Sequence, residues 1–205
     1  MVVIVDYGVG NLASIANMAR KAGTECVISS DAAAIARADK LILPGVGAFD
    51  RGKANLEERG LIPVLSERAV ERRVPTLGLC LGMQLMGRGS EEGVRRGLGW
   101  LAADSVKFKT GASGSGLKVP HMGWNYIEPG APSALVENLP PEPRFYFVHS
   151  YHLAVDDPSD VMCWTRYGDR FASGIHHGNL WGTQFHPEKS HSFGLALLKN
   201  FFALP

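Results

Sequence analysis

The sequence predicts a doubly wound α/β fold: a mostly parallel sheet with helices on both faces and a mixed or antiparallel C-terminal extension. Three short apolar runs, Val2 to Val5, Lys40 to Leu43 and Thr76 to Leu79, each end in a glycine-rich or nucleophile-bearing turn. Helical patterns lie between these runs, and such alternation is typical of a parallel sheet covered by helices.

The individual elements follow from the periodicity of apolar residues. Helices are expected at Leu12 to Lys21, Asp31 to Arg37, Leu61 to Arg72, Leu81 to Met86 and His191 to Phe202. Strands of the second half are expected at Ser105 to Phe108, Phe145 to His149, Val161 to Thr165, Ser173 to His176 and Leu180 to Phe185. The glycine- and serine-rich stretch Thr110 to Gly116 is expected to be a mobile loop, and Pro129 to Pro143 a proline-punctuated connection.

Length, charge and cysteine content limit the class of protein. With 205 residues, 45% of them apolar, we expect a single domain over residues 1–205. Basic residues number 21 and acidic residues 20, so the charge favours a small-molecule or protein partner over nucleic acid or an anionic membrane. Met1 to Val5 carries no basic leader, no apolar stretch could span a bilayer, and three distant cysteines suit a reducing compartment. We therefore expect a soluble cytoplasmic protein.

The segment from Gly78 to Gly82 reads Gly-Leu-Cys-Leu-Gly between an apolar strand and a helical pattern, which is typical of a nucleophile elbow. Such a sharp turn strains the backbone of Cys80 and requires glycine on both sides. The sulfur would then lie at a helix N-terminus, where free amide groups favour the thiolate. A lone free cysteine is more often structural, but the flanking glycines favour a nucleophile.

A cysteine nucleophile needs a base, and the base needs an acceptor that orients it. His186 and Glu188 follow an expected strand, and in an extended chain residues i and i+2 point to the same side. Pro187 stiffens the backbone between them. We therefore expect His186 to be the base and Glu188 its orienting acceptor, while His176 and His177 are interpreted as structural.

The oxyanion of the reaction needs hydrogen-bond donors. The elbow supplies the amide of Leu81, and the glycine-rich turn from Pro44 to Phe49 supplies a second donor near Val46. That turn lacks the Lys-Ser/Thr ending of a nucleotide-binding loop, so the oxyanion interpretation is preferred to a phosphate cradle.

Several motifs together resemble triad-type (class I) glutamine amidotransferases, namely Pro44 to Gly47, Gly78 to Gln84 and His186 to Glu188. Further segments resemble, within that class, the glutaminase subunit of imidazole glycerol phosphate synthase: Asp6 to Leu12, Pro120 to Asn125 and Phe147 to Tyr151. The resemblance covers the whole chain and implies the amidotransferase fold. Neither a cofactor nor a metal is expected.

The resemblance implies that Cys80 attacks the side-chain amide of L-glutamine, that His186 protonates the departing ammonia and then activates water, and that Glu188 orients His186. It implies an oxyanion hole formed by Val46 and Gly47 together with Leu81. It also implies that glutamine is held by Gln84, Glu92, Ser150 and Tyr151.

The partner implied by the resemblance is a (β/α)8-barrel cyclase subunit, which receives the ammonia and makes imidazole glycerol phosphate for histidine biosynthesis. The resemblance implies that glutamine hydrolysis is slow until that partner docks, because an amide in the turn at Gly45 to Gly47 points away from the oxyanion. The face that meets the cyclase is implied to include Asn11, Met122, Trp124, Tyr146 and Lys189. From composition alone, core packing is the simpler interpretation of Met122 and Trp124.

Three other functions stay open at this point. Gly8 to Ala13 fits a dinucleotide-binding fingerprint, with Asp31 near the distance of a ribose-binding acid. The His-Pro-Glu at 186–188 is similar to an element of zinc deaminases, but no Cys-x-x-Cys pair follows it. A catalytically silent scaffold that binds the barrel partner is disfavoured by the intact triad.

Overall fold

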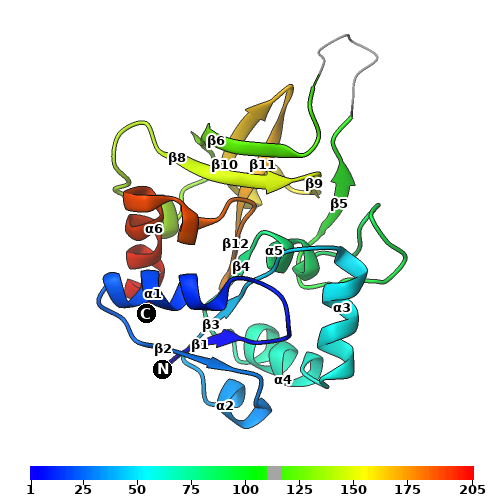
Figure 1. Cartoon of the computed structure of the whole chain (residues 1–205), viewed down its shortest axis with the longest axis vertical. Helices are drawn as coiled ribbons and strands as arrows, with labels where there is room; N and C mark the ends of the chain where they lie inside the picture. Colours follow the sequence, from blue (N-terminus) through cyan, green and yellow to red (C-terminus); the bar gives the residue numbers. More distant parts are fainter. Residues whose placement is uncertain (110–116) are drawn as a thin grey trace.

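The protein is built around one large twisted sheet, seen in the computed structural model of residues 1–109 and 117–205 (Figure 1). The expected mobile loop, Thr110 to Gly116, lies outside the described residues. Five adjacent strands are parallel: β2 (Cys26–Ser29), β1 (Val2–Val5), β3 (Lys40–Leu43), β4 (Thr76–Leu79) and β12 (Leu180–Thr183).

Antiparallel strands extend this sheet beyond β12, as expected for the second half of the chain. The neighbours in order are β11 (Asp169–His177), β10 (Val161–Tyr167) and β7 (Glu128–Pro129), while β9 (Tyr151–Val155) pairs with both β11 and β5 (Ala103–Lys107). A separate antiparallel pair consists of β6 (His121–Tyr126) and β8 (Arg144–His149). The predicted doubly wound sheet with a mixed extension is confirmed.

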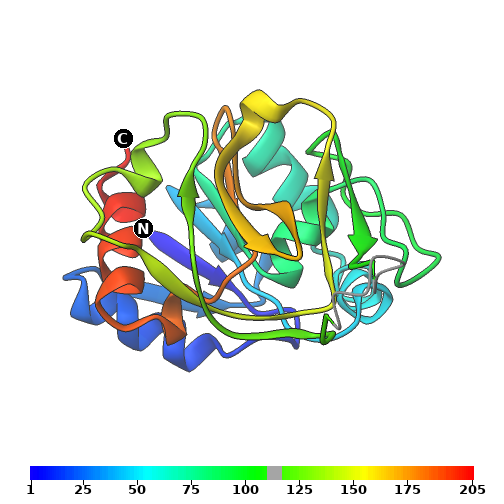
Figure 2. The ribbon, with the colours of Figure 1, turned by 90° about the horizontal axis from the view of Figure 1, so that it is seen from above.

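Helices cover both faces of the parallel part (Figures 1 and 2). Side chains of β1 alternate, so Val3 and Val5 pack into one core and Val2 and Ile4 into the other. The first core is covered by α2 (Ala32–Ala36), α3 (Phe49–Glu58), α4 (Ile62–Ser66) and α5 (Leu81–Met86). The second core is covered by α1 (Leu12–Lys21) and α6 (His191–Ala203).

All five expected helices are present. Those at 12–21 and 81–86 have the predicted bounds, and the helix expected from Leu61 is α4 continued by the π-helical turn η1 (Glu67–Glu71). The described residues also include the 3-10 turns η2 (Ala134–Val136), η3 (Pro158–Asp160) and η4 (Pro187–Lys189). The sequence did not predict α3, β2, β6, β7 or β9. No helix in the described part of the chain is long and apolar enough to cross a bilayer.

Candidate active site

Cys80 occupies a strained turn between β4 and α5. Its backbone has φ 51° and ψ −108°, a left-handed φ that costs a non-glycine residue about 1–3 kcal/mol. The surrounding structure holds this conformation, because the Cys80 amide donates to the carbonyl of Thr183 at 2.7 Å. A Cβ at Gly82 would collide with the carbonyl oxygen of Leu43. The strained elbow expected from the sequence is therefore present, and the sulfur lies at the N-terminus of α5.

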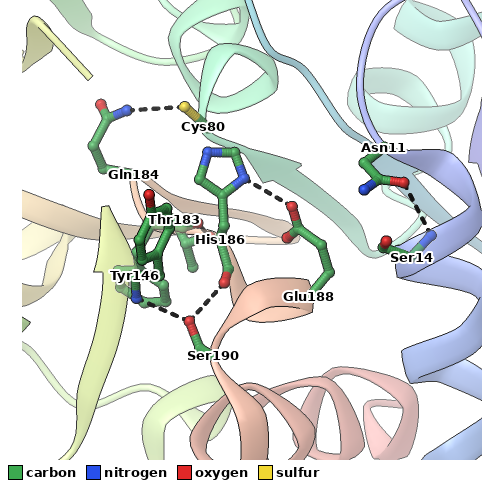
Figure 3. Close-up of polar contacts among 10 residues, drawn as sticks. Asn11, Ser14, Cys80, Tyr146, Thr183, Gln184, His186, Glu188 and Ser190 are labelled. Carbon is green, nitrogen blue, oxygen red and sulfur yellow. Dashed lines mark hydrogen bonds and ion pairs between the residues drawn. The ribbon is translucent and has the colours of Figure 1, made fainter. Parts of the chain in front are cut away.

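His186 and Glu188 form a buried pair beside this elbow (Figure 3). His186 Nδ1 lies 2.8 Å from Glu188 Oε1, and the two side chains are 2% and 3% exposed. The local geometry expected from the sequence is wrong, since the pair does not share one face of an extended strand. His186 precedes η4, with Pro187 at its first position, and this turn folds Glu188 back toward the imidazole.

The second imidazole nitrogen of His186 points toward Cys80 (Figure 3). Nε2 is buried and makes no well-aligned hydrogen bond to any described residue, a geometry that catalytic groups often have before substrate binds. Burial lowers the pKa of His186, but the adjoining Cys80 sulfur and Glu188 carboxylate raise it, and the net pKa is about 10. At neutral pH the imidazole therefore holds a proton that it can give to a leaving group.

The turn that follows β3 lies directly against the elbow. A Cβ at Gly45 would come within 2.7 Å of the Leu81 Cβ and 2.8 Å of the Gly82 amide. The hydroxyl of Tyr7 donates to the carbonyl of Pro44 and anchors the start of this turn. Burial, together with the charge of Cys80, raises the pKa of Tyr7 far above its ordinary range, so the hydroxyl stays a donor.

A cleft of about 400 Å³ opens at Cys80. It brings together Cys80 and every residue expected in the oxyanion hole or in glutamine binding: Val46, Gly47, Leu81, Gln84, Glu92, Ser150 and Tyr151. This volume is at the small end of ligand sites and suits a free amino acid.

Glu92 is fixed at the rim of the cleft by the start of α3. Its Oε2 accepts from the amide of Phe49 at 2.8 Å and so caps a helix that has no side-chain cap of its own. In return, Asp50 accepts from the amides of Val94 and Arg95, both at 3.0 Å. These reciprocal bonds hold a carboxylate beside the cleft.

The residues expected on the partner face lie near the triad. Met122 and Trp124 are 62% and 44% exposed, so core packing is the wrong interpretation of both. Trp124 pairs with Tyr146 across β6 and β8, and the carbonyl of Tyr146 accepts from the His186 amide at 2.9 Å. The Lys189 ammonium lies 5.7 Å from the ring centre of Tyr146. Asn11 caps α1, which packs against η4.

Residues 3–204 match the family model for glutamine amidotransferase class-I. The chain belongs to this family. It is 47% identical over 201 residues to the imidazole glycerol phosphate synthase subunit HisH 2 of Methanococcus maripaludis, a match that covers 98% of each chain. It is 46% identical over 204 residues to the subunit HisH 2 of Pseudomonas aeruginosa, a match that covers both chains completely.

Solved structures share the amidotransferase fold at low identity. The crystal structure of one glutamine amidotransferase superposes with a TM-score of 0.69 at 20% identity, covering 99% of this chain and 100% of that one. The CTPS glutaminase domain of Trypanosoma brucei, with bound acivicin, gives 0.65 at 14% identity, covering 100% and 94%.

Features that suggested other functions have structural explanations in this amidotransferase. The carboxylate of Asp31 accepts from the amide of Ala33 at 3.0 Å and caps α2. Gly10 lies against Pro44, so this glycine serves the packing of the turn that follows β3. Within residues 1–109 and 117–205, no group of three or more His, Cys, Asp or Glu side chains is placed to hold a metal ion.

Two buried polar residues near Cys80 were not identified as functional from the sequence. Tyr7 is fully buried beneath the turn that follows β3, and no local pattern distinguishes it from an ordinary core aromatic residue. Gln184 is also fully buried, and its Nε2 lies 3.5 Å from Cys80 Sγ. Its position two residues before the candidate base, at the end of an apolar strand, was the available signal.

Proposed function

We propose that residues 1–205 form one glutamine amidotransferase domain, which hydrolyses L-glutamine to glutamate and ammonia and delivers the ammonia to a (β/α)8-barrel cyclase subunit. The observation that carries this proposal is the strained Cys80, which lines an amino-acid-sized cleft and lies beside the protonated His186–Glu188 pair. The full-length relatives, which are imidazole glycerol phosphate synthase subunits, support the pathway, and the free cysteines support a cytoplasmic site.

The reaction proceeds through a thioester on Cys80. The sulfur attacks the side-chain amide carbon of glutamine, and the carbonyl electron pair moves to an oxygen held by the amide of Leu81 and the turn at Val46 and Gly47. The tetrahedral intermediate collapses and expels ammonia, which takes its proton from His186. The neutral imidazole then accepts a proton from water, which attacks the thioester and releases glutamate.

Glutamine is recognised by residues that line the same cleft as Cys80. The fixed carboxylate of Glu92 suits the α-ammonium group. Gln84 Nε2 donates to the Tyr151 carbonyl at 3.0 Å and to Gln184 Oε1 at 3.1 Å, so its side-chain oxygen is the atom left for a ligand. Ser150 and Tyr151 line this cleft together with Val46 and Gly47 of the oxyanion turn.

The cyclase docks on the face formed by Asn11, Met122, Trp124, Tyr146 and Lys189. Exposed large apolar side chains next to a catalytic centre are typical of a protein interface. Ammonia released beside His186 then leaves toward the partner. A misdirected amide in the turn at Gly45 to Gly47 would remove about 3 kcal/mol of transition-state stabilisation, about a hundredfold in rate, which accounts for activation by docking.

The proposal is tested by measuring glutamate release by the purified chain alone and with a barrel cyclase loaded with its ribotide ligand. We expect strong stimulation by the loaded partner and no release by Cys80→Ala under either condition. If the cyclase stimulated glutamate release in Cys80→Ala as well, the assignment of the triad would be refuted. If the cyclase did not change the rate of release by the wild type, the assignment to histidine biosynthesis would be refuted.

The docking face is tested by calorimetric titration of the cyclase into Trp124→Ala. Central aromatic anchors of interfaces cost at least about 2 kcal/mol when truncated, so Kd should rise more than about tenfold. Val70→Ala is the matched control, because Val70 is 50% exposed and lies on η1, away from β6 and β8. Equal affinities of both variants would place the interface elsewhere.

A further inference from the structure

A line of buried polar groups leads from β6 to the rim of the cleft. His149 Nδ1 lies 2.8 Å from the carbonyl oxygen of Tyr151, His149 Nε2 lies 3.1 Å from His121 Nδ1, and His121 Nε2 lies 3.2 Å from Asn125 Nδ2. His121 and His149 are 3% and 6% exposed. On β6, His121 and Asn125 lie on the face opposite to the exposed Met122 and Trp124.

The chemistry of both ends fixes every proton in this line. A carbonyl only accepts, so His149 carries its proton on Nδ1 and accepts at Nε2. His121 must then donate from Nδ1 and accept at Nε2, which requires the amide nitrogen of Asn125. That orientation of Asn125 is set independently, since its Nδ2 donates to the Arg166 carbonyl at 3.0 Å.

Both imidazoles are neutral, as this arrangement requires. Burial lowers the pKa of His121 to about 4 and that of His149 to about 3. Each ring therefore has one donor and one acceptor, and each is used once.

From the Tyr151 carbonyl the line continues to the nucleophile. Gln84 Nε2 donates to that carbonyl at 3.0 Å and to Gln184 Oε1 at 3.1 Å. Because its oxygen is committed to Gln84, Gln184 turns its Nε2 toward Cys80 Sγ, 3.5 Å away (Figure 3). Gln184 is 0% exposed. Burying a hydrogen-bond donor that makes no bond costs free energy, so an apolar side chain of the same length would be more stable here if the Nε2 donor were not used.

We infer that Gln184 is a further catalytic residue, which donates a hydrogen bond to the Cys80 sulfur while the sulfur is negatively charged. His121 and His149 are positioning residues, which hold the Tyr151 carbonyl so that Gln84 turns Gln184 in the required direction. The inference rests on the proposed function only in taking Cys80 as the nucleophile.

The first test compares Gln184→Met, which removes the donor at similar length, with Gln184→Glu, which adds a negative charge beside the sulfur. The rate of alkylation of the Cys80 peptide by iodoacetamide is measured against pH by mass spectrometry. A hydrogen bond to a charged group corresponds to a shift of the midpoint by about one pH unit or more. We expect an upward shift in Gln184→Met and a larger one in Gln184→Glu.

Ser173→Ala is the matched control. Ser173 is fully buried on β11, its carbonyl accepts from the Gln184 amide, and its hydroxyl contacts Thr165 and Cys163 but not Cys80. This variant tests whether loss of any buried polar group nearby moves the profile. Unchanged midpoints in both Gln184 variants, or an equal shift in Ser173→Ala, would overturn the inference.

The positioning role is tested at His121, which does not line the cleft. His121→Phe keeps a ring against Phe147 and Tyr167 but removes both hydrogen bonds. His121→Asn offers an amide donor near the position of Nδ1. The alkylation midpoint should rise in the Phe variant and return toward the wild-type value in the Asn variant. Identical midpoints in both would contradict the role of the imidazole line.

Two measurements separate the role of Gln184 from the proposed function: glutamate release tests the function, and the alkylation profile tests the role of Gln184. If the wild-type chain releases glutamate with its partner and Gln184→Met matches it in kcat and alkylation profile, only the role of Gln184 is refuted. A supporting result is a fall in kcat of roughly tenfold or more in Gln184→Met. If the wild type releases no glutamate, the function is refuted, while the alkylation profiles, which need no glutamine, still decide the inference.

Discussion

Replacing Glu188 with glutamine removes one negative charge that faces the His186 imidazole across 2.8 Å. With side chains only 2% and 3% exposed, salt screens this interaction little. The amide oxygen of glutamine can still accept from Nδ1, so the variant loses the charge but not the contact. For the neutral imidazole that activates water, a hydrogen bond to the carboxylate is worth about 1.5–3 kcal/mol and one to an amide oxygen about 0.5–1.5 kcal/mol. The difference, about 1–1.5 kcal/mol, corresponds to roughly a tenfold fall in kcat.

The same substitution changes the pH dependence. Glu188 is one of the groups that raise the pKa of His186 to about 10, so its neutralisation lowers that pKa. The imidazolium is then lost at lower pH, and the alkaline limb of the kcat profile moves toward neutrality. The assay is the initial rate of glutamate release with saturating cyclase, measured from about pH 6 to about pH 10.

The outcome separates two roles of Glu188. An orienting residue is neither attacked nor transferred, so its loss costs less than that of Cys80 or His186. A loss of rate as complete as in Cys80→Ala, together with a lower Tm, would mean that Glu188 holds the fold. A wild-type rate with an unmoved alkaline limb would mean that Glu188 does not orient His186.

Two further predictions concern stability. Gly82→Ala would force a Cβ onto the Leu43 carbonyl and lower the free energy of unfolding by about 1–3 kcal/mol. Thermal unfolding of this variant should therefore show a Tm lower by several degrees. The control Gly89→Ala should have the wild-type Tm, because a Cβ at this position meets nothing closer than 4.0 Å. His121 and His149 have folded pKa values of about 4 and about 3, below the value of about 6.5 in unfolded chains. The unfolded state therefore binds more protons as pH falls from about 6.5 to about 4, and the free energy of unfolding in urea should decrease over that range. His121→Phe should have a smaller decrease, and an identical pH slope would contradict the buried neutral assignment.

The parts of the fold that local sequence determines were predictable. The elbow is fixed by Gly78 and Gly82 around one cysteine, and α5 begins directly after it. By contrast, α3 contains Gly52, which weakens a helical pattern. In the structure a Cβ at this position would lie 3.0 Å from the Leu81 side chain, so close packing on α5 accounts for the glycine.

Polar groups in the interior explain the other omissions. An apolar alternation identifies a half-buried strand, but β6 turns His121 and Asn125 inward and Met122 and Trp124 outward. The alternation in β6 is therefore the reverse of the usual pattern, with polar residues facing inward. For this reason the apolar pattern predicted neither the strand nor its exposed apolar face. The capping role of Glu92 depends on two segments 43 residues apart, which only the folded chain brings together.

The most direct test of the account is to find the covalent intermediate. The wild-type chain, mixed with the loaded cyclase and L-glutamine, is quenched in acid, digested and analysed by mass spectrometry. We expect a γ-glutamyl thioester on the peptide that contains Cys80, and none on the peptides that contain Cys26 or Cys163. Steady glutamate release with the glutamyl group on another residue, or with full activity retained in Cys80→Ala, would contradict it.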